Sequence, residues 1–162
     1  MNLTTAIMIS LGICFLSAFL ERSAAGKNVK PLFAKLRAPA YAPPTWLWVV
    51  IGVLYYVICF FVLFRILVHQ GDKAARYFSL TLILVMMAIN GIFNYTFFRL
   101  ESLYHGRMTF KPYLPAVAAL FVCLLRLEPV AAFVLIPYFF YLVFAMILID
   151  KFLQLNPDLR GH

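Results

Sequence analysis

The sequence predicts an all-α integral membrane protein, a single domain over residues 1–162 folded as a bundle of five transmembrane helices. The chain is 65% hydrophobic and only 12% charged, with a mean hydropathy of +0.93, whereas a soluble domain is about half apolar and about a quarter charged. Five apolar segments, each about as long as a membrane crossing requires, alternate with connections that carry proline, glycine or charge. The lipid bilayer is therefore the expected environment of the chain.

The first predicted helix covers residues 3–20, which contain no charged side chain. No Lys or Arg precedes Arg22, so this segment lacks the basic start of a secretory signal and is expected to remain as a helix. Residues 21–44 follow as the longest connection, which is polar, basic and interrupted by four prolines. We expect this connection to form a lid-like loop.

The second predicted helix, residues 45–68, begins directly after Pro43 and Pro44. Proline fixes φ and has no backbone N–H, so this part of the loop is expected to be stiff. Trp46 and Trp48 are expected at the boundary between water and lipid, where amphipathic rings are favoured. A lid over a pocket needs such rigidity, whereas an ordinary connection at a membrane face does not.

Three further helices are predicted over residues 77–98, 112–127 and 129–153. The fourth helix is short for a span unless the residues before it join the helix. The third contains Asn90, and a side-chain amide inside hydrocarbon is costly without a partner. Asn90 is therefore expected either to hydrogen-bond a neighbouring helix or to face a cavity, and the sequence leaves both alternatives open.

The basic residues are unevenly divided between the two sides of the predicted bundle. One side holds ten: Arg22, Lys27, Lys30, Lys35, Arg37, Arg99, Arg107, Lys111, Lys151 and Arg160. The other side holds four: Arg65, Lys73, Arg76 and Arg126. The positive-inside rule places the first side in the cytoplasm, with the N-terminus outside and the C-terminus cytoplasmic. This sidedness explains the net charge of +8, so no nucleic-acid partner is expected.

The start of the chain bears on which membrane is expected. It carries no transit-like segment. This favours a bacterial inner membrane, and a mitochondrial outer membrane is the alternative for a eukaryotic protein.

Catalytic and metal-binding patterns do not occur in the sequence. The three cysteines lie in separate apolar segments and the three histidines are scattered, so no metal site is expected. All six acidic residues lie near helix ends, in connections or in the tail. No paired carboxylates, nucleophile with a base, or glycine-rich phosphate loop is present. The sequence thus favours binding over catalysis, with no catalytic residue and no required cofactor.

Two predicted helices each group aromatic side chains on one face. Spacings of three and four residues put four side chains on one face of the third predicted helix: Met86, Asn90, Phe93 and Phe97. The same spacing groups four side chains on the fifth: Tyr138, Tyr141, Ala145 and Leu148. Such faces form either the core of a bundle or the wall of a ligand cavity, and the pattern alone leaves both open.

Four short motifs carry a resemblance to a known family. Residues 38–46, APAYAPPTW, are similar to the signature KPxWxPPxW, and residues 88–98, AINGIFNYTFF, are similar to LNxxWSxxFF. Residues 137–145, PYFFYLVFA, are similar to PYLxWVxFA, and Leu155–Asn156 to a closing LN. These motifs, in this order over about residues 32–156, resemble the TspO/MBR family of tryptophan-rich sensory proteins and mitochondrial translocator proteins.

This resemblance implies a five-helix bundle, commonly a homodimer, around a cavity closed by the loop between the first two helices. Family ligands are tetrapyrroles such as protoporphyrin IX and haem, and sterols or synthetic drugs in the mitochondrial members. The expected function is a membrane-embedded binding protein for a hydrophobic planar ligand, above all a porphyrin, in a sensory, regulatory or transfer (transport) role. The alternatives are a porphyrin-degrading enzyme and a structural or regulatory membrane subunit whose cavity is filled with side chains.

The chain departs from the family at its tryptophans, which fall on Leu32, Tyr41, Phe93 and Tyr141, so that only Trp46 is kept. Three of these four replacements keep a flat ring that can stack on a macrocycle. The loss of indoles counts against tryptophan-dependent degradation. The expected ligand-binding residues are Tyr41, Pro43, Pro44, Trp46, Asn90, Phe93, Phe97, Tyr138, Tyr141 and Ala145.

Overall fold

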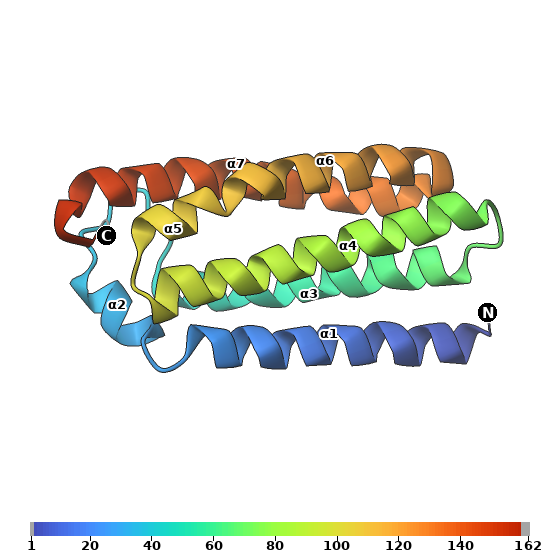
Figure 1. Ribbon diagram of the computed structural model, residues 1–162, viewed down its shortest axis with the longest axis horizontal. Coiled ribbons are helices and arrows are strands. Elements are labelled where there is room, and N and C mark those ends of the chain that lie inside the picture. The colour runs from blue at the N-terminus through green and yellow to red at the C-terminus, as the bar shows by residue number, and fades with distance from the viewer. Residues whose placement is uncertain (1, 160–162) are drawn as a thin grey trace.

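The computed structural model describes residues 2–159, and in this part of the chain it is helical throughout with short connections (Figure 1). Five helical segments are long and apolar enough to cross a membrane, which confirms the predicted fold class. They are α1 (Leu3–Ala25), α3 (Thr45–Val68), α4 (Lys73–Asn94) with the π-helical turn η1 (Tyr95–Arg99), α5 (Leu103–Met108) with α6 (Phe110–Leu127), and α7 (Pro129–Leu155). The chain ends in the short 3-10 helix η2 (Pro157–Leu159).

Three boundaries differ from the sequence prediction. Helix α1 continues to Ala25, one full turn into the segment expected to be a loop. That segment also contains a further helix, α2 (Val29–Lys35). Helix α4 starts at Lys73 because the Asp72 side chain accepts a hydrogen bond from the Ala74 amide at 2.8 Å and so caps the helix. The fourth span reaches 25 residues because α5 precedes α6.

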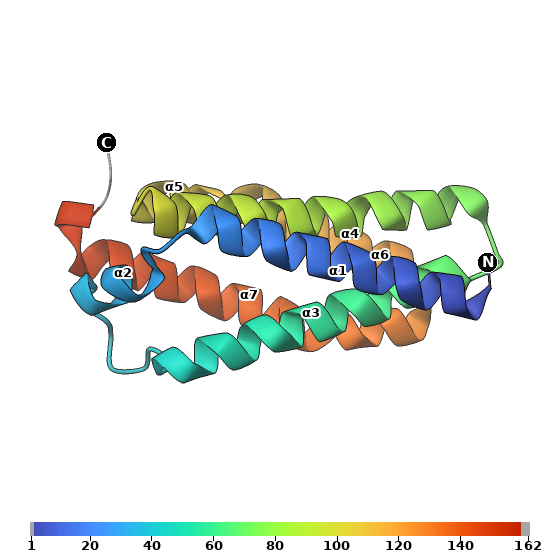
Figure 2. The same ribbon diagram turned by 90° about the horizontal axis from the view of Figure 1, so that it is seen from below.

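The helices pack as an elongated bundle, seen from two sides in Figures 1 and 2. Helix α1 packs against α3 and α4, α4 packs against α6, and α7 packs against α6 and α3. The contacts are made by side chains that are at most 1% exposed, such as Leu63, Met86, Leu120 and Leu148. Ser10 and Cys14, two small residues four positions apart in α1, are buried. Small residues let helices approach closely, which matters in lipid, where apolar burial alone does not drive association.

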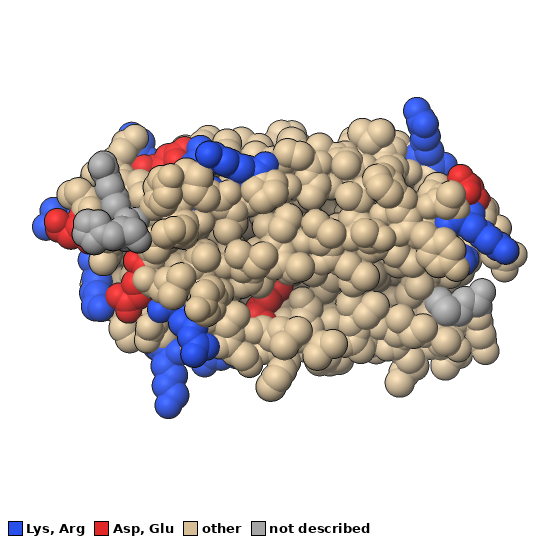
Figure 3. All heavy atoms as spheres, in the orientation of Figure 1, with Lys and Arg blue, Asp and Glu red and all other residues tan. Residues whose placement is uncertain are grey.

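The two ends of the bundle differ in what they carry. Helices α2 and α5 and the end of α7 lie at one end, and the start of α1 lies at the other with the α3–α4 and α6–α7 turns (Figures 1 and 2). Charged side chains gather at the two ends and leave a nearly uncharged middle on the face shown in Figure 3. Apart from Arg160, which lies outside the described residues, the ten basic residues assigned to one side occur in the segments of the α2 end.

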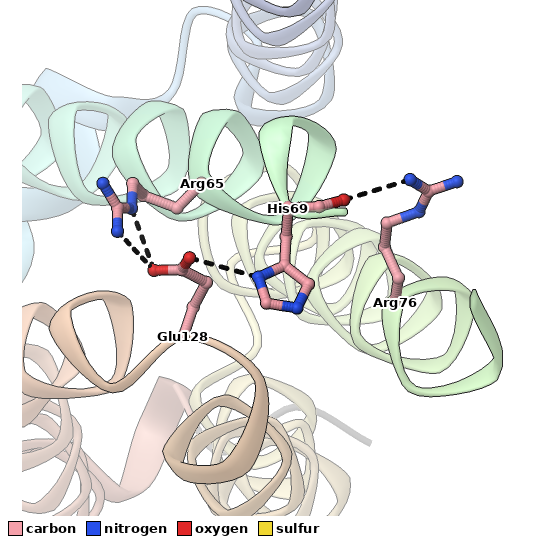
Figure 4. Close-up of polar contacts among 4 residues, drawn as sticks. All are labelled: Arg65, His69, Arg76 and Glu128. Carbon is pink, nitrogen blue, oxygen red and sulfur yellow. Dashed lines mark hydrogen bonds and ion pairs between the residues drawn. The ribbon is translucent and has the colours of Figure 1, made fainter. Parts of the chain in front are cut away.

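The end opposite α2 is closed by a cluster of four side chains (Figure 4). Glu128 accepts hydrogen bonds from Arg65 Nε at 3.0 Å and Nη2 at 2.6 Å, and its other oxygen lies 3.2 Å from His69 Nδ1. Arg76 donates to the His69 carbonyl oxygen at 3.2 Å. Gly71 allows this arrangement, because a Cβ there would lie 2.3 Å from His69 Nε2. The cluster joins the end of α3 to the starts of α4 and α7.

Candidate functional site

A cavity of about 460 Å³ occupies the half of the bundle nearest α2. Its volume lies within the range of about 300–1,000 Å³ that small-molecule sites usually have. Side chains from α1, α2, α3, α4, η1, α6 and α7 line it. Because these elements come from the whole length of the chain, the cavity forms only when all five spans are packed.

Aromatic rings form much of the cavity wall. Phe93 and Phe97 stack with their centroids 5.2 Å apart, and Phe110 meets Phe93 edge to face at 5.7 Å. The π-helical turn η1 places Phe97 and Phe98 consecutively on this wall, 4.9 Å apart. Single π-helical turns often occur at functional sites. The wall therefore offers several ring faces to an apolar, flat molecule.

Helix α2 covers the cavity at its outer end. Phe33 of α2 packs between Trp48 at 6.0 Å and Phe98 at 5.8 Å, measured between ring centroids. Lys35 of α2 forms an ion pair with Glu101, which follows η1, at 3.2 Å. The side chains that the segment 21–44 adds to the cavity beyond α1 come from α2: Val29, Lys30 and Phe33.

The connection between α2 and α3 is tied to the end of α7. Asn156 accepts a hydrogen bond from the Arg37 amide at 2.8 Å and donates to the Arg37 carbonyl oxygen at 3.0 Å. Its amide also donates to the Phe152 carbonyl oxygen at 2.9 Å. One asparagine thereby pairs both backbone groups of Arg37, and this pairing holds the cover in place.

A carboxylate lies in the wall between α1 and α4. Glu21 is only 8% exposed. One of its oxygens accepts hydrogen bonds from Asn90 Nδ2 at 2.8 Å and Asn94 Nδ2 at 3.5 Å, and the other from Ser17 Oγ at 3.3 Å. The sequence interpretation placed Glu21 in the loop, which is wrong, because α1 continues for another turn. Asn90 contacts the neighbouring helix and lines the cavity as well, so the two alternatives left open for it are both realised.

Tyrosines form the deep end of the cavity. The hydroxyl groups of Tyr113 and Tyr138 form a short hydrogen bond with each other. The ring of Tyr55 lies 5.3 Å from that of Tyr138, and Tyr141 lies 6.0 Å from it on the next turn. This end is thus polar but uncharged.

A family model matches residues 6–154 of the chain, described as the TspO/MBR family. The chain belongs to the TspO/MBR family. The match covers the five spans and the segment between α1 and α3. No curated protein matches the sequence. Family membership agrees with the five-helix membrane bundle, and TspO/MBR proteins are in general membrane proteins that bind tetrapyrroles or sterols or act as sensors.

Six of the ten residues expected to bind ligand line the cavity of this TspO/MBR protein: Asn90, Phe93, Phe97, Tyr138, Tyr141 and Ala145. The other four, Tyr41, Pro43, Pro44 and Trp46, do not line it. Tyr41 is 49% exposed and Trp46 65% exposed. In their place, Trp48 and Phe33 face the cavity.

The alternative of a filled cavity requires bulky side chains, and Phe93, Phe140 and Tyr141 are the ones in the sequence that could fill the space. Phe93 and Tyr141 line the cavity wall and leave the space open. Phe140 points outward and is 69% exposed. The fold of this TspO/MBR protein therefore keeps an internal space despite its missing tryptophans.

Sequence reasoning missed four prominent wall residues: Glu21, Phe33, Trp48 and Tyr55. For Glu21 a signal was present, because a carboxylate that directly follows an apolar helix and stands four residues after Ser17 is easily included in that helix. Trp48 is two positions after Trp46, which is about 200° around a helix. Which of the two faces inward depends on the orientation of α3 in the bundle.

Proposed function

We propose that this protein binds a tetrapyrrole, a porphyrin or haem, and acts as a sensory, regulatory or transfer protein. The observation that carries the proposal is the cavity of about 460 Å³, lined with aromatic rings and covered by α2. A macrocycle needs a flat apolar slot, and the rings of Phe93, Phe97 and Trp48 supply faces for stacking. Sterol-like molecules are the second ligand class, because the same wall accepts any rigid apolar body.

The charges around the cavity support a ligand that carries carboxylates at one edge. Arg22 and Lys30 line the outer end of the cavity, and both are exposed. The deep end is formed by uncharged tyrosines. A tetrapyrrole with propionates on one edge would place them at the basic outer end and its apolar edge among the rings.

We propose binding and not catalysis as the activity of the cavity. Its one carboxylate, Glu21, is held by two asparagine amides and a serine hydroxyl, and no histidine or cysteine lines the cavity among the described residues. General acid–base catalysis commonly pairs a carboxylate with a second carboxylate or a histidine, and the cavity lining holds neither among the described residues. The rival, a porphyrin-degrading enzyme, predicts loss of porphyrin absorbance over time, which a binding protein does not produce.

A porphyrin titration tests the proposal on the purified chain in detergent. Protoporphyrin IX is expected to bind saturably, with a shift of its main absorption band. Ala145→Trp places an indole in the cavity and should abolish binding, whereas Ile147→Trp, on the same helix but 50% exposed, should preserve it. Equal binding by the parent and Ala145→Trp would show that the porphyrin binds elsewhere and would end the proposal.

We also propose a homodimer in a membrane whose cytoplasmic face meets the α2 end. The lipid-facing groove between α1 and α4 carries small residues, among them Ser17, Ala24, Ala88 and Gly91, which permit close helix contact. Disulfide cross-linking between chains that carry Ala88→Cys tests this interface. A chain that stays uncrosslinked and sediments as a monomer would refute the dimer.

A further inference from the structure

Among the described residues, Glu21 is the only acidic side chain that is buried, and it has no cationic partner. Glu101, Glu128 and Asp150 each pair with a Lys, Arg or His side chain. Within residues 2–159, no basic side chain forms an ion pair with Glu21, although Glu21 is more than nine-tenths buried inside a membrane-spanning helix. An ionisable residue inside a span is costly and usually marks a functional site, because its charge is expected to meet a counter-charge.

The position of Glu21 leaves its carboxylate accessible to a ligand. It lines the internal cavity and also the lipid-facing groove between α1 and α4. Figure 3 shows acidic atoms recessed in a crevice over the seam between these helices, in the otherwise uncharged middle of that face. Gly91 of α4 lies beside Glu21, because a Cβ built there would be 3.7 Å from the Glu21 side chain, an ordinary van der Waals contact. A molecule inside the cavity can therefore approach the Glu21 side chain.

The aromatic wall adds a second attraction for positive charge. Ring faces carry a negative quadrupole, so a cation within about 6 Å of a ring centroid is stabilised, most strongly where water is excluded. Trp48, Phe93 and Tyr56 line the same cavity as Glu21. A buried carboxylate among ring faces is the combination that a delocalised or protonated organic cation requires.

We propose that the cavity is also a binding site for lipophilic organic cations, with Glu21 as the counter-ion and the aromatic wall as the surface for their apolar bodies. This ligand class goes beyond the proposed tetrapyrrole, whose carboxylates favour the basic outer end at Arg22 and Lys30. Cations would pair with Glu21, and tetrapyrrole carboxylates would pair with Arg22 and Lys30. Because both ligands would occupy the same cavity, they would compete for binding.

The test compares two compact probes of nearly equal shape and opposite charge, tetraphenylphosphonium and tetraphenylborate. Each probe is titrated into the full chain in the same uncharged detergent. The uptake of the probe by detergent micelles is then the same for every variant and can be subtracted. Glu21→Gln is expected to weaken tetraphenylphosphonium binding about tenfold or more, the scale of one close charge pair at partial burial. Tetraphenylborate binding should stay equal or become tighter.

Two further variants make the result decisive. Asp150→Asn removes a carboxylate at the same end of the bundle but outside the cavity, and should leave both affinities unchanged. Glu21→Asp keeps the charge and should retain the preference for the cation, which tests the proposal even if Glu21→Gln does not fold. The proposal is overturned if the parent binds no phosphonium above the micelle background, or if Glu21→Gln and the parent show equal cation affinity; Glu21 would then only join α1 to α4.

Discussion

Asn90 of α4 donates its side-chain amide to the Glu21 carboxylate of α1 at 2.8 Å, which links residues 69 positions apart. Asn90→Leu should lower the free energy of unfolding by about 1–3 kcal/mol, because a buried carboxylate loses a charge-assisted hydrogen bond. Thermal unfolding in detergent measures the loss. Asn94→Leu, whose amide is 3.5 Å from the same oxygen, should cost less.

The double variant Glu21→Leu/Asn90→Leu provides the control for this pair. Replacing both partners removes the unpaired carboxylate along with the amide, so the double variant should be more stable than Asn90→Leu alone. Strictly additive losses would show that the two side chains do not interact in the membrane-embedded protein.

Phe33 is expected to hold the cover of the cavity closed. Phe33→Ala removes two ring contacts, with Trp48 and Phe98. Porphyrin affinity should fall about tenfold, which corresponds to about 1.4 kcal/mol and is within the range expected for two aromatic pairs. Replacing Pro43 and Pro44 by glycine should have a smaller effect, since neither lines the cavity. The reverse order of effects in the same titration would mean that the proline segment is the cover.

Asn156 should control the mobility of the α2–α3 connection. Asn156→Ala frees both backbone groups of Arg37, and a spin label at Ala38 should report faster motion in the unbound protein. Gln154→Ala, an exposed change on the same helix, serves as the control. Identical label mobility in all three proteins would show that the connection is held by other contacts.

The cluster at the opposite end should affect stability without affecting ligand binding. Glu128→Gln removes the charge that Arg65 and His69 share, and because these groups are partly exposed the loss should be about 1 kcal/mol. Gly71→Ala should also destabilise, because its methyl group would meet His69 Nε2. Porphyrin affinity should remain at the parent value in both variants, and a fall would indicate coupling between the two ends.

The orientation in the membrane is predicted from the basic residues. On a background without Cys14, Cys59 and Cys123, a cysteine at Lys30 should react with a reagent added from the cytoplasmic side, and one at Lys73 with a reagent added from the opposite side. The structure places these positions at opposite ends of the bundle. Reaction of both from the same side would contradict a five-span topology.

The five helical spans and the family could be predicted from the amino-acid sequence alone. A lipid bilayer requires every backbone polar group to be paired within its own segment, so an apolar run of about 20 residues has few structures available other than a helix. Local signals were less complete, because the start of α4 was predicted at residue 77 without recognising Asp72 as its N-cap. A spacing of three and four residues grouped side chains of α4 and α7 on shared helix faces, but it did not decide between bundle core and cavity wall.

Only the tertiary structure decided which charges and rings meet in the cavity. Glu21 becomes a buried wall residue because Asn90 and Asn94, far along the chain, come to lie beside it. Phe33 covers the cavity because α2 forms inside a proline-rich connection and packs on Trp48 and Phe98. These outcomes depend on the rotation of each helix about its own axis, and that rotation is set by packing among all five spans and not by the residues of any one of them.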